Sequence, residues 1–395
     1  MLPRVKIFFQ NGNLGQQAVN ADGVLGLIGS GIAIVGKFEL NKAYILYSMD
    51  DLAALGITAA TNAALYKLVS EFYANAPSGT EVWLMAFPDT LLVSDIVDKD
   101  KDNAKLLINA ANGRLKGLVV SRTPDVTYVP VITDGLDADV ALAATNAQAL
   151  AEWATDTKFA PLFVILEGYG YAGDPADLAD LSEGQNNRVG IFIGDTVIDS
   201  KNATMGTIAG RIASIPVQRN IGRVKDGAIA SITGFIGDKT VEVADVETLN
   251  TKRYMTMRTF VGRSGYFFSD DPLATAATDD YSNLSYRRTI DKACRVAYDT
   301  LLPILLDEVP VNSDGTIQLP YARSWEAAIE DAIVSQMTAN GELSADVENG
   351  DNGVICAIDT TVNLVAGNPF KVLIQVRPFG YARLVDVYLG FQTIS

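Results

Sequence analysis

Thr61-Asn-Ala-Ala-Leu-Tyr-Lys-Leu-Val-Ser-Glu-Phe-Tyr73 carries apolar residues at helical spacing, and the turn Pro77-Ser-Gly79 leads from it into Glu81-Val-Trp-Leu-Met-Ala-Phe87. The spacing predicts a helix followed by a buried strand. Similar segments alternate up to about Pro216: we expect further helices over 103–112, 137–155, 175–181 and 205–215, and strands over 117–121, 161–166 and 189–193. Short buried strands separated by helices predict an α/β domain with a mostly parallel sheet and flanking helices on both faces.

Beyond Pro216 the sequence becomes more polar and irregular. It contains strand-like segments over 240–243 and 254–261 and two predicted helices, Asn283–Asp307 and Ser324–Ala339. This change indicates a second domain of the α+β class. We therefore expect an N-terminal strand arm over residues 1–20, the α/β domain over 21–216, a C-terminal domain over 217–378 and a C-terminal strand arm over 379–395.

Both ends of the chain carry apolar segments with strand propensity. The residues expected to pair are Val5, Ile7, Phe8 and Phe9 in the N-terminal arm and Leu384, Val385, Val387, Tyr388, Leu389 and Phe391 in the C-terminal arm. An apolar strand whose backbone is unpaired promotes aggregation, so each arm must pair within its own sheet or with that of a neighbour. The two arms together predict subunits that join by strand addition.

The composition excludes several classes of function. The 395 residues include no histidine, which excludes Ser-His-Asp and Cys-His catalysis and zinc or haem ligation by histidine within one chain. A formal net charge of −16 argues against nucleic-acid binding. Cys294 and Cys356 are too few for a disulfide framework and have no metal-like spacing. We expect no cofactor, no metal and no catalytic residue.

No membrane association is expected either. The most apolar window, Gly23–Gly36, is shorter than a membrane span and contains five glycines, so it predicts a strand, a tight turn and a second strand. The first residues, Met1-Leu-Pro-Arg-Val-Lys6, lack the pattern of a signal peptide. We therefore expect synthesis and assembly in the cytoplasm.

One glycine-rich motif invites comparison with dinucleotide sites. Gly168-Tyr-Gly-Tyr-Ala-Gly173 fits G-x-G-x-x-G and follows a predicted strand. However, Asp174-Pro175 occurs where the helix should already have begun, and two tyrosines crowd the place of a pyrophosphate. An ordinary loop is the favoured interpretation, with nucleotide binding as the alternative.

A charged cluster lies in the C-terminal half. Its acidic members are Asp270, Asp271, Asp279 and Asp280, and its basic members are Arg287, Arg288, Lys292 and Arg295 on a predicted helix. One interpretation is a network of ion pairs between neighbouring subunits, sensitive to salt and able to exchange partners. The other is a solvated helix face with local pairs that contribute little.

Several stretches together resemble contractile tail sheath proteins of phages and phage-like injection systems. They are Gly210–Pro216 with Arg219–Gly222, Gly262–Phe268 with Asp270–Pro272, Tyr286–Arg295, the helix with Trp325 and Glu326, and the terminal strands over 372–376 and 385–391. No single stretch is specific. Their order and spacing, which extend over nearly the whole chain, carry the resemblance.

The resemblance implies a structural protein and not an enzyme. Such a subunit would have a C-terminal sheath domain and arms that join sheets in adjacent subunits, and it would polymerise as stacked six-membered rings around an inner tail tube protein. Contraction would drive the tube through a target envelope, and baseplate and terminator proteins would be further partners. The location implied is a virion tail or phage-like particle assembled in the host cytoplasm.

The resemblance also implies that the second predicted helix of the C-terminal domain faces the tube. The residues concerned are Trp325, Glu326, Glu330 and Asp331. Two other functions stay open from the residues themselves. One is a closed-ring tail terminator or baseplate scaffold, and the other is a nucleotide-binding α/β enzyme that uses Gly168–Gly173.

Overall fold

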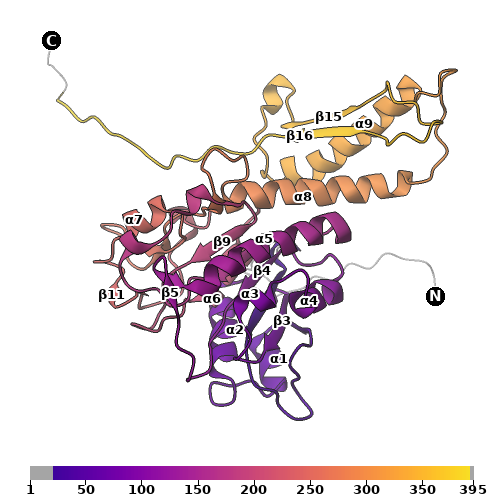
Figure 1. The fold of residues 1–395 in the computed structure, drawn as a ribbon. Coiled ribbons are helices and arrows are strands. Elements are labelled where there is room, and N and C mark those ends of the chain that lie inside the picture. Colours follow the sequence, from indigo (N-terminus) through magenta and orange to yellow (C-terminus); the bar gives the residue numbers. More distant parts are fainter. Residues whose placement is uncertain (1–20, 392–395) are drawn as a thin grey trace, which may run out of the picture. The chain divides into compact units, whose positions relative to one another are not determined.

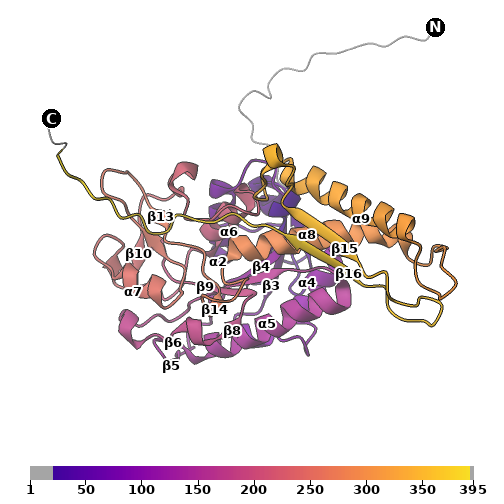
Figure 2. The same ribbon diagram turned by 90° about the horizontal axis from the view of Figure 1, so that it is seen from above.

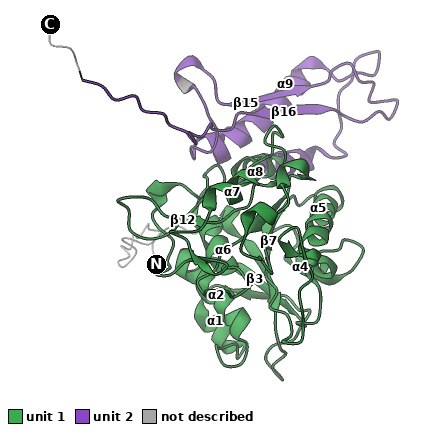
Figure 3. Cartoon of the chain, turned by 60° about the vertical axis from the view of Figure 1, so that its left-hand side comes forward, with its two compact units in different colours: residues 1–295 green, residues 296–395 purple. Residues whose placement is uncertain are grey.

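The computed structural model describes residues 21–391. It divides into two compact units, residues 1–295 and 296–395, which are coloured separately in Figure 3. This division does not coincide with the boundary predicted near Pro216, because the segment that follows Pro216 packs on the first unit. The Phe268 ring meets the Phe192 ring edge-on with 5.7 Å between centroids, and the Met255 N–H donates to Ile191 O at 3.0 Å.

A six-stranded sheet forms the centre of the first unit (Figure 1). Its order is β2 (Tyr44–Leu46), β3 (Val82–Phe87), β1 (Leu25–Ser30), β4 (Gly117–Val120), β7 (Phe163–Glu167) and β9 (Val189–Phe192). All neighbours are parallel except β2, which is antiparallel to β3. Every residue of the five parallel strands is buried, as expected for a sheet covered on both faces.

Helices cover both faces of this sheet. α2 (Ala63–Asn75) and α6 (Met205–Ser214) lie on one face, and α4 (Asn103–Ala111) and α5 (Ala138–Lys158) lie on the other (Figure 2). The shorter helices are α1 (Met49–Ala54), α3 (Val93–Ile96) and α7 (Val246–Thr251). The α/β class and the parallel-rich sheet predicted from periodicity are therefore confirmed.

Two local predictions in the first unit are wrong. The second strand expected at the end of Gly23–Gly36 does not form, because Ile32 and Val35 lie in a loop and are mostly exposed. The helix expected over 175–181 is replaced by two 3₁₀ turns, Pro175–Asp177 and Leu181–Glu183. Each turn is capped by the aspartate that precedes it, Asp174 or Asp180.

Short antiparallel pairs complete the first unit. They are β5 (Ile132–Thr133) with β6 (Leu136–Asp137), β8 (Gln185–Asn186) with β14 (Ala274–Thr275), β10 (Phe235–Ile236) with β11 (Lys239–Thr240), and β12 (Met257–Arg258) with β13 (Phe267–Phe268). The helix α8 (Leu284–Leu301) begins in the first unit and ends in the second.

The second unit contains one helix packed on a two-stranded hairpin. α9 (Leu319–Ile333) continues into a π-helical turn, Val334–Thr338, so this helix starts earlier than the predicted Ser324–Ala339. β15 (Val354–Ile358) and β16 (Val372–Val376) are antiparallel. A small core of Ile317, Ala322 and Ile358 joins the helix to β15. No helix in residues 21–391 is long and apolar enough to span a membrane.

Candidate assembly site

The hairpin of the second unit has two edges with different environments. At its ends, the Arg377 N–H donates to Gly353 O at 2.8 Å and the Asp359 N–H donates to Lys371 O at 3.0 Å. Hydrogen-bonded and non-hydrogen-bonded pairs alternate along an antiparallel ladder. Cys356 opposite Ile374 is therefore a non-hydrogen-bonded pair, and the backbone groups of these two residues point away from the partner strand.

Two glutamates of α9 bind the outward-facing amides of β15. Glu326 Oε1 accepts the Ile358 N–H at 2.8 Å, and Glu330 Oε1 accepts the Cys356 N–H at 2.7 Å. Glu326 is only 7% exposed and also accepts a bond from Arg323 Nη1 at 2.7 Å. Two of the N–H groups at this edge, those of Cys356 and Ile358, are therefore already hydrogen-bonded within the chain.

The opposite edge, that of β16, is open. The backbone groups of Val372, Ile374 and Val376 face outward by the same alternation. Among residues 21–391, no hydrogen bond to these N–H groups is found. The three side chains are only half-buried, which leaves apolar surface next to unpaired backbone.

The predicted C-terminal arm extends beyond this hairpin. Residues 377–391 form no helix or strand. The six predicted pairing residues have side chains between 72% and 106% exposed: Leu384, Val385, Val387, Tyr388, Leu389 and Phe391. The predicted N-terminal pairing residues Val5, Ile7, Phe8 and Phe9 lie outside the described residues.

Most of the residues predicted to face an inner tube have partners inside the second unit. The Trp325 ring meets Phe370 edge-on with 5.4 Å between centroids, and Glu326 and Glu330 reach β15. Of the four, only Asp331 is exposed. A tube contact by this helix stays a prediction. Asp331 is the one of these four residues whose exposed side chain could make it.

The basic members of the charged cluster contact other parts of the first unit. Arg287 Nη2 lies 2.9 Å from Asp291 Oδ1, and Lys292 Nζ lies 2.7 Å from Asp22 Oδ2. Arg295 Nη1 donates to Pro161 O at 3.1 Å. Arg288 donates to the last carbonyls of α6, with Nη2 3.1 Å from Ile212 O and 3.0 Å from Ile215 O.

The acidic members contact backbone and side-chain amide groups of the first unit. Asp271 accepts the Ser285 N–H at 2.8 Å and so binds the start of α8, while Asp279 accepts from Asn187 Nδ2 at 3.1 Å. Asp270 accepts from Asn220, and Asp280 is exposed. These are contacts within one chain, so an exchange of partners between subunits stays a prediction.

The acids that pair with the bases of α8 were not identified in the sequence analysis. Asp291 bonds both Arg287 and Arg188, whose Nη1 lies 3.1 Å from it. The i,i+4 spacing of Arg287 and Asp291 was a signal in the sequence. Asp22, which is 270 positions from Lys292, had no local signal.

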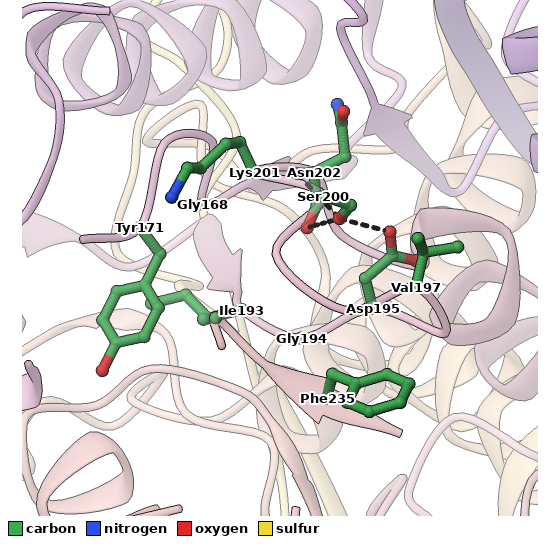
Figure 4. Close-up of a pocket in the computed structure, with 11 residues that line it drawn as sticks. Gly168, Tyr171, Ile193, Gly194, Asp195, Val197, Ser200, Lys201, Asn202 and Phe235 are labelled. Atoms are coloured by element: carbon green, nitrogen blue, oxygen red, sulfur yellow. Dashed lines mark hydrogen bonds between the residues drawn. The ribbon is translucent and has the colours of Figure 1, made fainter. Parts of the chain in front are cut away.

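The glycine motif forms a loop at the end of β7. Gly170 and Gly173 have φ of +77° and +97°, which glycine adopts without strain. The pocket beside this loop is lined by Gly168, Tyr171, Asp195, Ser200 and Lys201, among others (Figure 4). Its internal volume of about 10 Å³ holds about one water molecule. A nucleotide does not fit there.

A buried carboxylate lies next to this loop. Glu167, 3% exposed, accepts the Arg122 N–H at 2.8 Å and the Ala203 N–H at 2.6 Å. Burial raises the pKa of Glu167 to about 7, although the hydrogen bonds from Ala203, Arg122 and Asn202 oppose this shift. The carboxylate ties the loops after β4 and β9 to the end of β7. Among the described residues, no cluster of His, Cys, Asp or Glu side chains could hold a metal ion.

Comparison with known proteins gives two family matches. The model of the DUF2586 N-terminal domain matches residues 2–272, and that of the DUF2586 C-terminal domain matches residues 280–394. Among curated proteins, nothing matches.

Similar solved structures belong to contractile assemblies. A chain of the anti-feeding prophage baseplate is 13% identical with a TM-score of 0.65, covering 100% of this chain and 99% of its own. A chain of the contracted sheath complex of the extracellular contractile injection system PVC is 14% identical with a TM-score of 0.63, covering 99% and 97%. The sheath tail protein of Desulfitobacterium hafniense is 11% identical with a TM-score of 0.50, covering 91% and 94%. At these identities the likeness is one of fold: the chain has the fold of contractile sheath proteins.

Proposed function

Because this chain belongs to the DUF2586 family and has the fold of contractile sheath proteins, we propose that it is the structural subunit of a contractile tail sheath. The subunit polymerises helically with copies of itself. It surrounds an inner tail tube, and its contraction drives the tube through a target envelope.

The observation that carries this proposal is an exposed apolar arm next to an unpaired strand edge. The arm residues 384–391 present six side chains between 72% and 106% exposed, and β16 offers outward-facing backbone groups. A donor at one site and an acceptor at another make a heterologous contact, which generates a helical polymer when it does not close into a ring. Strand addition supplies the backbone hydrogen bonds of such a contact.

The finer features of the proposal are those implied by the resemblance to contractile tail sheaths. Copies of the chain form stacked six-membered rings. The proposed partners are an inner tube protein and baseplate and terminator proteins. The proposed location is a virion tail or phage-like particle assembled in the host cytoplasm. The match to a sheath complex in its contracted state supports the contractile part. No observation in residues 21–391 supports the nucleotide-binding enzyme, whose pocket has room for about one water molecule.

Electron microscopy of the purified protein at increasing concentration tests this function. We expect the full chain to form hollow, striated tubes of uniform width. A chain that ends at Arg383 lacks the arm, and we expect it to stay in separate subunits. Its thermal unfolding should match that of the full chain, since residues 384–391 are all exposed. Tubes formed by the truncated chain would contradict the strand-addition mechanism.

A baseplate or terminator ring is the second candidate function. It is favoured by the match to a chain of the anti-feeding prophage baseplate. The same micrographs separate the two functions, because a ring component would form closed rings that do not stack into tubes at any concentration. Rings alone would replace the sheath proposal with this one.

A further inference from the structure

We propose that Glu326 and Glu330 close the β15 edge of the hairpin and so restrict strand addition to β16, where the C-terminal arm of a second copy of this chain binds. The inference rests on the proposed function, since it assigns the edge at which the subunits join. It gives α9 a role as the element that selects the acceptor strand.

The first step is a match between two repeats. Residues four apart on a helix are separated by about 6 Å along its axis, and alternate residues of a strand by about 6.8 Å. Glu326 and Glu330 are four apart, and they bond the amides of Ile358 and Cys356, which are two apart. The order is reversed, so α9 runs antiparallel to β15. Each carboxylate therefore meets one outward-facing N–H.

The second step concerns the consequence for a strand that approaches β15. A new strand would have to displace both carboxylates from charge-assisted bonds, which are stronger than bonds between neutral groups. The displaced Glu326 is only 7% exposed, and a buried carboxylate without its partners is costly. Charged side chains at a strand edge are a common protection against unwanted pairing. The β15 edge is thus closed to an incoming strand at Cys356 and Ile358.

The third step is the character of the β16 edge. Val372, Ile374 and Val376 point to the same face of the hairpin as the buried residues of β15 but are themselves only half-buried. This difference arises because α9 packs against β15. A strand added to β16 would extend the sheet and place its own apolar side chains over this half-covered surface.

The fourth step is the pattern of the arm. Val385, Val387, Leu389 and Phe391 occupy alternate positions, and all are apolar. The intervening positions are Asp386, Tyr388 and Gly390. This alternation is that of a strand with one buried face. In Figure 3 the arm leaves the hairpin as an extended segment, and its side chains are not covered by its own β16. A second copy therefore supplies the acceptor.

Photo-cross-linking tests which edge receives the arm. In the full chain, Phe391→p-benzoylphenylalanine places a photoreactive ring at an exposed arm position. After assembly and irradiation, mass spectrometry locates the residues joined to it. We expect intermolecular adducts in residues 371–377 and none in residues 353–359. Adducts in residues 353–359 of assembled tubes would overturn the edge assignment and leave the sheath function standing.

Substitution of the glutamates tests their role directly. Glu326→Ala with Glu330→Ala frees both amides, and we expect adducts to appear in residues 353–359 in addition to those in β16. The matched control is Glu326→Gln with Glu330→Gln, whose amide oxygens still accept the two N–H groups. We expect its adducts to stay in β16. An unchanged adduct pattern in the alanine variant would overturn the role of the glutamates.

Folding and assembly are checked separately. Circular dichroism establishes whether the double alanine variant folds. If it does not, Glu330→Ala alone frees the Cys356 amide while keeping the more deeply buried Glu326 bond. If the unmodified protein forms neither tubes nor intermolecular adducts, the proposed function fails, and this inference fails with it.

Discussion

The buried carboxyl of Glu167 makes the stability of the first unit depend on pH. Its pKa is raised by burial to about 7 in the folded protein, against about 4.3 in an unfolded chain. Between these values the folded state binds a proton that the unfolded state has released. The free energy of unfolding therefore falls by an amount on the order of 3 kcal/mol as pH rises from about 4.5 to about 7. It stays low at higher pH.

Glu167→Gln removes this dependence. The amide resembles the protonated carboxyl, but its NH₂ cannot accept a bond such as that from the Arg122 N–H, so we expect the variant to be less stable than the parent at pH 5 by about 1–3 kcal/mol. The difference should shrink, or reverse, by pH 8. Thermal unfolding of both proteins at pH 5, 6, 7 and 8 measures it. Parallel profiles would contradict the shifted pKa of Glu167.

At the scale of elements, the close contact of α2 with α6 depends on two glycines. A Cβ added to Gly206 would lie 2.1 Å from Leu68 O, and one added to Gly210 would lie 2.5 Å from Phe72 O. Backbone atoms on both sides leave no flexible group to move aside. We expect Gly206→Ala to lower the free energy of unfolding by about 1–3 kcal/mol or more, as measured by urea denaturation. Gly380→Ala is the control, because no atom lies within 4 Å of its Cβ position. Equal stability of the two variants would contradict the close helix contact.

Local periodicity was sufficient to predict most of the central sheet and its helices. The helix predicted over 61–73 is α2, Ala63–Asn75, and the strand predicted over 189–193 is β9, Val189–Phe192. Such segments bury one face or both, and burial imposes a period on the sequence. Ile32 and Val35 are apolar yet exposed, so hydrophobicity alone predicted a strand that does not form.

The candidate assembly site was predictable only in part. The C-terminal arm was visible as an apolar run with strand propensity. The closure of β15 was not, because it joins residues far apart in sequence: Glu326 bonds an amide 32 positions away. In the sequence Glu326 and Glu330 are simply two acids on a helix, and only the fold reveals which backbone groups they bind. The pairing of Lys292 with Asp22 was hidden for the same reason.

At the scale of the whole molecule, net charge opposes assembly. Each chain carries a formal charge of −16, and stacked subunits bring these charges together. All four bases that one interpretation placed between subunits already contact an acid or a carbonyl within the described part of the chain at 3.1 Å or less: Arg287, Arg288, Lys292 and Arg295. Repulsion between subunits should therefore exceed ionic attraction between them.

Salt should consequently promote polymerisation. Raising sodium chloride from 0.01 M to about 0.3 M shortens the Debye length from about 30 Å to less than about 10 Å, which screens the repulsion but leaves strand pairing and apolar burial largely intact. We expect the lowest protein concentration that gives tubes to fall several-fold, as measured by sedimentation and micrographs. Chloride is preferred to sulfate, which would itself strengthen apolar burial. The opposite result, tubes that dissolve as salt is raised, would mean that ion pairs between subunits dominate, and it would favour the exchangeable network over the intrachain contacts of α8.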